Sequence, residues 1–421
     1  MAQLSIGLDI RSEIIRCVRL KSTFRSVAVL DAQRVQIPQD ERPYPERVAE
    51  ALRAFQELRD PSAQLATTIP GDEGSLHLLD LPFVDRKKID QTIGFELESL
   101  TPFALDEVVY DYLQVAKTPE GVSMLVGLCA KDRLSSWLQV FKDVGLDPRQ
   151  VGVESLAYTS LIDLLPACPE GEATAFVDVG RRLTSVCVFG AQGVSFARTL
   201  SAGLGHLIGA QAERNAAEPA FVLAEQKYSL EVLREKLAPL LRELRQTFAT
   251  YAAKYRQPVT TLWLCGTDAT VQNLEEFLTT ELSVPTQHLR AEQLHLPDIE
   301  RLNHDRYLGE WIKALGLALH AHQGGRRGWL NLRRGAFSFT ADTEYVRGKI
   351  NRVAAGLAIL MILAMGSGMV RCLSLSAAER ALDRVCKKSP SLCSASPMTT
   401  RKSRSQSSRI RFHPGLTRCR T

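Results

Sequence analysis

The chain has 421 residues, enough for two or three domains, and an ordinary globular composition with 45% hydrophobic and 24% charged residues. Its net charge of +5 is uneven, because residues 371–421 carry 12 Lys/Arg and 2 Asp/Glu, which leaves the first 352 residues with a net charge of −5. An acidic N-terminal region argues against a nucleic-acid-binding protein. The nine cysteines are scattered, without the spacing of a zinc site, and this pattern fits a reducing compartment.

The first 70 residues predict a strand-rich unit with one helix. Three short β-branched segments, separated by turn-length gaps, predict a β-meander. Pro45–Arg59 has apolar residues at helical spacing and predicts an amphipathic helix. A further strand, Ala63–Ile69, ends at Pro70-Gly71. The meander strands are Leu4–Ile10, Ile14–Leu20 and Val27–Val35.

The next segment mixes helices and strands, and we expect a small α+β insertion over about residues 76–150. Its alternating apolar residues predict strands, and its longer periodic stretches predict helices. The predicted strands are His77–Leu81, Glu107–Val115, Val122–Cys129 and Gln150–Val153, and the predicted helices are Asp85–Leu100, Asp132–Val144 and Ser155–Leu165.

A second β-meander begins near residue 173 and repeats the plan of the first. In both meanders the first strand ends in an aspartate, Asp9 and Asp178. Two meander-plus-helix halves predict an α/β fold made by duplication, with a cleft between the halves. The predicted strands are Thr174–Val179, Thr184–Phe189, Gly193–Thr199, Thr261–Cys265 and Pro285–Leu289, and the predicted helices are Ser201–Arg214, Leu230–Tyr255, Ala269–Leu282 and Arg306–His320.

Four stretches resemble the actin-like ATPases, specifically the pilus-assembly PilM and type II secretion GspL families. IGLDIRSEIIRCVRL and VDVGRRLTSVCVF are similar to the two phosphate loops, and LWLCGTDATVQNLEEFL to the adenosine-side motif. FELESLTPFALDEVVYDY resembles the inserted subdomain and is the most specific. The resemblance implies an actin-like fold of duplicated ribonuclease-H-like halves over residues 1–322. The four stretches are Ile6–Leu20, Val177–Phe189, Leu262–Leu278 and Phe95–Tyr112.

This resemblance also points to residues of a nucleotide cleft. Asp9 and Asp178 match the carboxylates that hold Mg²⁺ in this fold, while Gly180 and Thr184 match the second phosphate loop. Gly266 matches the adenosine side. Glycines at such turns let backbone N–H groups approach a phosphate closely.

The same motifs depart from the family at decisive positions. Arg11 replaces the glycine expected after the first strand, and its side chain would crowd or pair with a phosphate. Thr267 replaces the second glycine of the adenosine motif. We therefore expect a vestigial cleft without catalytic residues, no ATP hydrolysis, and no firm role for ATP or Mg²⁺. In the simplest interpretation, Asp9 and Asp178 only cap turns.

Residues 323–352 are predicted to form a linker and a juxtamembrane segment. Trp329–Phe337 (WLNLRRGAF) is similar to a segment that GspL carries ahead of its membrane helix. Soluble PilM ends before such a segment and binds a similar one from a partner. The resemblance thus favours GspL, and implies an inner-membrane subunit that docks a GspE-like assembly ATPase and meets GspM-like or PilN/PilO-like subunits, as a homodimer or higher oligomer.

The predicted membrane span is 353–370, an 18-residue run without a charge. Arg352 and Arg371 flank it, and a buried core helix is the alternative. Without an export signal ahead of it, we expect a single-pass inner-membrane protein with a cytoplasmic N-terminus.

Residues 371–386 predict a short helix. Residues 387–421 predict a disordered basic tail, interpreted as a truncated or out-of-frame end or as a segment binding lipid or nucleic acid.

Other functions have less support in the sequence. The first rival is a membrane-tethered actin-like ATPase whose nucleotide state gates assembly. The second is an actin-like cell-division scaffold. A metal site is not expected, because His320 and His322 are two residues apart and a helix would not place them on one face.

Overall fold

The computed structural model describes residues 3–388 except 24–25, 56–57, 59, 61–62, 119–120, 206, 208–227, 267–270, 303–307, 325–327 and 340. In the last helix, the side chains of residues 341–360, 362, 385–386 and 388 are also outside the description. The chain forms two compact units, residues 1–339 and residues 340–421. Each is described by itself.

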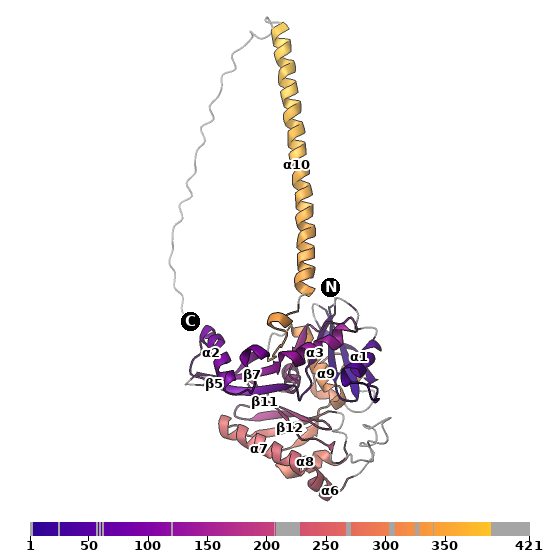
Figure 1. Ribbon diagram of the computed structural model, residues 1–421, viewed down its shortest axis with the longest axis vertical. Coiled ribbons are helices and arrows are strands. Elements are labelled where there is room, and N and C mark those ends of the chain that lie inside the picture. The colour runs from indigo at the N-terminus through magenta and orange to yellow at the C-terminus, as the bar shows by residue number, and fades with distance from the viewer. Residues whose placement is uncertain are drawn as a thin grey trace, which may run out of the picture. The chain divides into compact units, whose positions relative to one another are not determined.

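Two five-stranded sheets of the same plan form the body of residues 1–339 (Figure 1). The strand orders are β3-β2-β1-β4-β8 and β11-β10-β9-β12-β13. In each sheet the first three strands are antiparallel and the last two join in parallel. The predicted duplication is therefore confirmed. The strands are β1 (Gln3–Ile10), β2 (Ile14–Ser22), β3 (Val27–Gln36), β4 (Gln64–Thr68), β8 (Gln150–Gly152), β9 (Ala173–Val179), β10 (Thr184–Gly190), β11 (Gly193–Leu200), β12 (Val259–Cys265) and β13 (Thr286–His288).

A smaller antiparallel sheet, ordered β5-β7-β6, lies within the predicted insertion. Helix α2 covers it, because its apolar residues recur at helical spacing and pack on the strands as a separate core. The elements are β5 (Gly74–Leu81), α2 (Arg86–Glu98), β6 (Val108–Thr118) and β7 (Gly121–Ala130), and the helix residues in this core are Ile89, Ile93 and Leu97.

Further helices cover the outer faces of the two large sheets. Helices α1 (Tyr44–Arg53) and α3 (Lys131–Lys142) share a core with β1, β2 and β4. Helices α6 (Leu230–Lys236), α7 (Ala238–Tyr255) and α8 (Leu274–Leu282) pack on the second sheet (Figure 1).

Helix α9 (Ile312–Gln323) lies in the core that the two large sheets share. Its sequence is apolar on nearly every side, as expected of a buried helix, and residues 312–321 are all buried. It approaches β1 so closely that a Cβ at Gly7 would overlap the backbone of Ala314 and Ala318. Glycine at this position therefore allows the helix to lie directly on the strand.

Two helix predictions were wrong in detail. Instead of one helix over 155–165, the chain forms two 3₁₀ turns, Glu154–Leu156 and Thr159–Leu164. The hydroxyls here bond to backbone carbonyls, since Thr159 donates to Leu156 O at 2.9 Å, and such bonds compete with a regular helix. The predicted helix Leu230–Tyr255 is divided at Leu237, because Pro239 begins a new helix and cannot continue the previous one.

Other boundaries shift or lie outside the description. The helix predicted at Arg306–His320 begins later, at Ile312, and residues 303–307 are not described. Most of the predicted helix Ser201–Arg214 also lies outside the described residues.

The WLNLRRGAF segment docks on the body of residues 1–339. The backbone N–H of Leu332 donates to Val151 O at 2.8 Å, and the Asn331 side chain accepts from the Val151 N–H at 3.1 Å. Asp111 on β6 accepts from the Asn331 N–H at 2.9 Å. Trp329 is buried and stacks on His320 with ring centroids 4.1 Å apart. The segment thereby ties β8, the insertion and α9 together.

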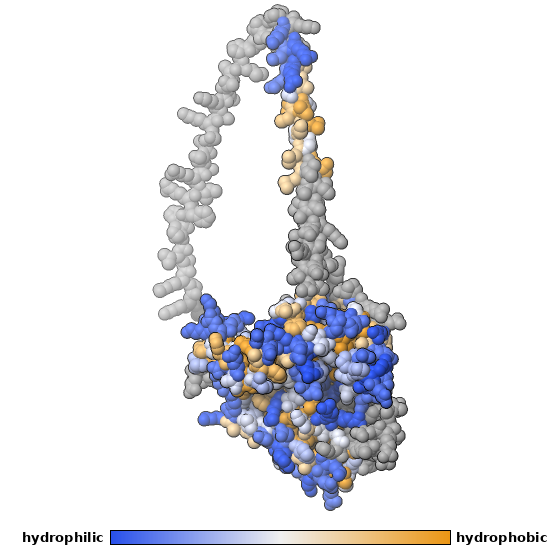
Figure 2. Space-filling model, in the orientation of Figure 1, coloured by the Kyte–Doolittle hydropathy of each residue, from blue (hydrophilic) through white to orange (hydrophobic). Residues whose placement is uncertain are grey.

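The second unit contains a single helix, α10 (Ala341–Lys388). Its described large apolar side chains, from Met361 to Leu382, are exposed, and Figure 2 shows hydrophobic residues along this part. Among the residues that the structure describes, no helix combines the length and the apolar character needed to cross a membrane. The side chains of half of the predicted span, residues 353–360 and 362, are not described. The tail, residues 389–421, also lies outside the described residues.

Candidate functional site: a buried ion network at the cleft

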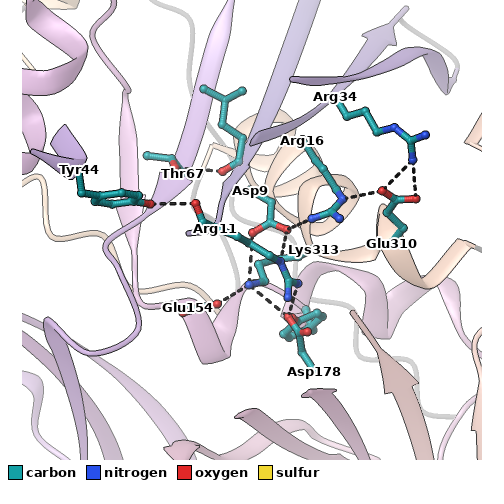
Figure 3. A network of polar contacts seen from close by, with 12 residues as sticks. Asp9, Arg11, Arg16, Arg34, Tyr44, Thr67, Glu154, Asp178, Glu310 and Lys313 are labelled. Carbon is teal, nitrogen blue, oxygen red and sulfur yellow. Dashed lines mark hydrogen bonds and ion pairs between the residues drawn. The ribbon is translucent and has the colours of Figure 1, made fainter. Parts of the chain in front are cut away.

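Asp9 and Asp178, the predicted cleft carboxylates, do come together (Figure 3). Asp9 lies near the end of β1 and Asp178 near the end of β9, so the repeated sheet plan brings the two strand ends to one place. Both side chains are buried. Arg11 bridges them, with its Nε 2.9 Å from Asp9 Oδ2 and a terminal nitrogen 2.7 Å from Asp178 Oδ2.

A second cation, Lys313 in the first turn of α9, reaches the same carboxylates. Its Nζ lies 3.3 Å from Asp9 Oδ1 and 3.1 Å from Asp178 Oδ2, and it also donates to Glu154. The side chain of Lys313 is only 1% exposed. The Tyr158 hydroxyl donates a further hydrogen bond to Asp178. Both predicted carboxylates are therefore paired with cations of the protein itself.

The charges set the protonation states of the site. Burial by itself raises the pKa of Asp9 and Asp178, but Arg11 and Lys313 hold each pKa below its ordinary value. Burial lowers the pKa of Lys313, yet Asp178, Asp9 and Glu154 raise it above the ordinary value. The carboxylates are thus ionised and the lysine is charged at neutral pH.

A second group of ion pairs continues the network along β2 and β3. The Nε of Arg16 lies 3.0 Å from Glu310 Oε1, and Arg34 lies 3.2 Å from the same oxygen. Arg16 also lies 3.8 Å from Asp9. Among the described residues, the network joins at least four basic side chains with four carboxylates. Its members are Arg11, Arg16, Arg34, Lys313, Asp9, Glu154, Asp178 and Glu310.

The predicted second phosphate loop uses its backbone N–H groups internally. The N–H of Gly180 donates to Leu183 O at 3.0 Å, that of Leu204 to Gly180 O at 3.0 Å, and that of Gly205 to Arg181 O at 2.8 Å. The Thr184 hydroxyl donates to Ala202 O at 2.7 Å and does not contact the carboxylates. Gly180 and Thr184 therefore shape this loop.

Gly266 adjoins the carboxylates from the end of β12. Its φ of +95° favours glycine, and a Cβ there would overlap Asp178 Oδ1. The sequence-predicted neighbour Thr267 lies outside the described residues. Of the six predicted residues, Asp9, Arg11, Asp178 and Gly266 thus meet at one point.

Sequence reasoning missed the residues that complete the network. Lys313 carried a signal, since it is one charge within an apolar helix, and so did Arg16 within an apolar strand. A buried charge needs a partner, but the sequence did not identify that partner. The other missed members are Arg34, Glu154, Tyr158 and Glu310.

His320 has a packing role. Its Nε2 lies 3.0 Å from Thr159 Oγ1, and its ring is buried against Trp329. Burial lowers its pKa to about 3. No cluster of metal-ligating side chains occurs in the described part of the chain.

The His320 pKa predicts an acid-sensitive fold. Because the unfolded imidazole has a pKa of about 6.5, unfolding takes up a proton between pH 6.5 and 3, and stability falls as pH falls through this window. From pH 6.5 to 5, His320 contributes a loss of about 1.5 kcal/mol. Urea unfolding at pH 6.5 and pH 5 measures the loss of stability between the two. In His320→Gln this loss should be about 1.5 kcal/mol smaller than in the parent. In the exposed control His295→Gln it should equal that of the parent. Equal losses in parent and His320→Gln would refute the assignment.

Comparisons with known proteins place this geometry in a family. A sequence model described as type IV pilus assembly protein PilM matches residues 7–322. The chain belongs to the PilM family. A search of curated proteins gives no match.

A solved structure of the same family supports the fold of this PilM-family chain. A PilM–PilN type IV pilus biogenesis complex is similar with a TM-score of 0.63 and 19% identity, covering 75% of this chain and 98% of the other. The cytoplasmic domain of EpsL, an inner-membrane component of the type II secretion system of Vibrio cholerae, gives a TM-score of 0.39 and 12% identity over 80% of this chain and 100% of the other. The fold is the actin-like ATPase fold, as the sequence predicted.

Proposed function

We propose that this PilM-family protein is a non-enzymatic docking scaffold of a type IV pilus or related secretion machine. In this role its actin-like body holds an assembly ATPase at the inner membrane through protein–protein contacts. The observation that carries the proposal is the bridging of Asp9 and Asp178 by Arg11 and Lys313.

The cleft residues do not fit a magnesium nucleotide in their present arrangement. A divalent cation would have to displace two protein cations that already neutralise the carboxylates. The second loop has its N–H groups at Gly180, Leu204 and Gly205 bonded to carbonyls, so these do not point at a phosphate. A fold retained as a scaffold after its nucleotide site is filled accounts for both features.

Partners and attachment follow from the family and from the docked segment. A PilM-family structure is a complex with PilN, and this supports a PilN-like partner here. Residues Asn331–Arg334 dock on the body of residues 1–339, where they contact Val151, Asp111 and Asp147. We propose that residues 353–370 attach the chain to the inner membrane, with the body on the cytoplasmic side. An uncharged 18-residue run flanked by arginines supports this attachment.

Titration of MgATP into the full chain, followed by calorimetry, tests the scaffold proposal. We expect no binding by the parent, with any Kd weaker than about 1 mM, and binding at about 100 μM or tighter by Arg11→Gly. The reason is that glycine removes the bridging guanidinium and restores space at the end of β1. Arg11→Lys is the matched control, which keeps a cation and is expected not to bind.

The rival function is a membrane-tethered ATPase whose nucleotide state gates assembly. Micromolar binding by the parent that disappears in Asp9→Ala would establish this rival and end the scaffold proposal. Unfolding curves of all variants should accompany the titrations, so that loss of binding is not confused with loss of the fold.

The second candidate function is a role in type II secretion, and the docked segment supports it. Its resemblance to the GspL juxtamembrane segment is the observation that favours it, and the docking shows the segment to be part of the folded body. Deletion of the gene should abolish pilus assembly if the scaffold serves a type IV pilus, and export of folded proteins if it serves a type II secretion machine.

A further inference from the structure

Helix α2 is capped by Asp85, which accepts from the Lys88 N–H, but the charged residues within its first and last turns stand in the order that the helix dipole disfavours. Arg86–Lys88 form its first turn, and Glu96 and Glu98 lie in its last turn. The N-terminus is the positive end of a helix macrodipole and the C-terminus the negative end, so both groups raise the free energy of the helix. Within the described residues none of these five side chains has an ion-pair partner.

One exposed stripe of α2 combines these charges with an aromatic ring. Lys88, Gln91, Phe95 and Glu98 follow at spacings of three, four and three residues, which place them on one side of a helix. All four are exposed, and Phe95 is 74% accessible. The opposite side of the helix packs on the three-stranded sheet. The stripe thus combines an exposed aromatic ring with a basic residue at one end and an acidic residue at the other.

We propose that this stripe is a self-association surface, on which two copies of the chain pair their α2 helices antiparallel. Each Lys88 then faces Glu98 of the other copy, and each Phe95 lies over Gln91 of the other copy. The arrangement is self-complementary, as a two-fold interface requires. It also places the positive end of each helix beside the negative end of the other, which removes the unfavourable dipole interaction.

The order of the charges along α2 favours a second copy of the chain over an anionic lipid or a nucleic acid as the binding partner. Anionic lipid or nucleic acid would attract Arg86–Lys88 but repel Glu96 and Glu98. A parallel pair of helices would put like charges side by side. Leu100 and Phe103, exposed just after α2, extend the apolar surface toward the end where the other copy presents its exposed Val84. Figure 2 shows hydrophobic residues beside charged ones on this part of the body.

Photo-crosslinking of the full chain tests the pairing directly. A benzoylphenylalanine replaces Gln91, and mass spectrometry locates the crosslinked residue. We expect a covalent dimer whose crosslink falls within residues 84–103 of the other copy. The same photoreactive residue at Glu231, an exposed position on α6, is the control and should give no dimer.

Charge reversal makes the test specific. In the background that carries the photoreactive residue, one variant has Arg86, Lys87 and Lys88 replaced by Glu, and a second has Glu96 and Glu98 replaced by Lys. Each variant should give about tenfold less covalent dimer than the parent, because like charges then face each other. An equal mixture of the two should restore the dimer yield, since both ends of the first variant's helix are now acidic and both ends of the second variant's helix are basic.

The same substitutions separate lost pairing from lost folding. Each variant reverses the charges at one end of the helix to the sign that the dipole prefers and leaves the other end unchanged, so each should unfold at an unchanged or higher urea concentration than the parent. A crosslink outside residues 84–103, or dimer yields in the mixture that stay as low as in each variant alone, would overturn the proposal. These outcomes do not depend on nucleotide or on the assembly ATPase, so the inference stands or fails separately from the scaffold function.

Discussion

Replacement of Lys313 by methionine is expected to lower the free energy of unfolding of residues 1–339 by about 3–5 kcal/mol, the cost of breaking a buried ion pair on one side. Methionine retains the length and apolar stem of lysine but leaves Asp9, Asp178 and Glu154 with one cation fewer. Urea unfolding of the full chain, followed by tryptophan fluorescence, measures the change.

The control for this prediction is Lys236→Met, at a half-exposed lysine that pairs with its neighbour Glu235. It should change stability by less than about 0.5 kcal/mol. The double variant Lys313→Met/Asp178→Asn should recover part of the loss, because it removes one of the uncompensated charges. If Lys313→Met proves as stable as the parent, Lys313 does not neutralise the buried carboxylates.

Replacement of Gly7 by alanine is the second change with a large expected effect. The added Cβ would overlap the carbonyl oxygen of Ala314 and the amide nitrogen of Ala318, which belong to the backbone of α9 and cannot rotate away. We expect a loss of at least about 3 kcal/mol, the upper end of the cost of overpacking, despite the small gain from a less flexible unfolded chain. Urea unfolding measures the loss.

Gly309→Ala serves as the matched control for Gly7→Ala. Gly309 is also buried, but the nearest atoms to its added Cβ lie 3.9 Å away, which is ordinary contact. Its stability should stay within about 1 kcal/mol of the parent. Equal effects at the two glycines would mean that α9 does not lie directly on β1.

The site was partly predictable, because its first members stand in repeated sequence patterns. Asp9 and Asp178 each end the first strand of a meander, and a duplicated fold brings such positions together. Arg11 was singled out as a departure that would crowd or pair with a phosphate, and in the structure it bridges the two carboxylates instead. The two wrong helix predictions have local causes, since Pro239 and the Thr159 hydroxyl interrupt regular helices.

The sequence by itself determined the strands, the duplication and the identity of the two buried carboxylates, because alternation and periodicity are local properties of the chain. Only the tertiary structure decided what neutralises them. Lys313 is 304 positions from Asp9, and it reaches the carboxylate only because Gly7 and Gly316 let α9 lie against its neighbours. Ion pairs over such separations depend on packing between elements, which no local pattern specifies. The sequence thus predicted that Asp9, Asp178 and Arg11 belong to one site, and the packing of α9 supplied the second cation, Lys313.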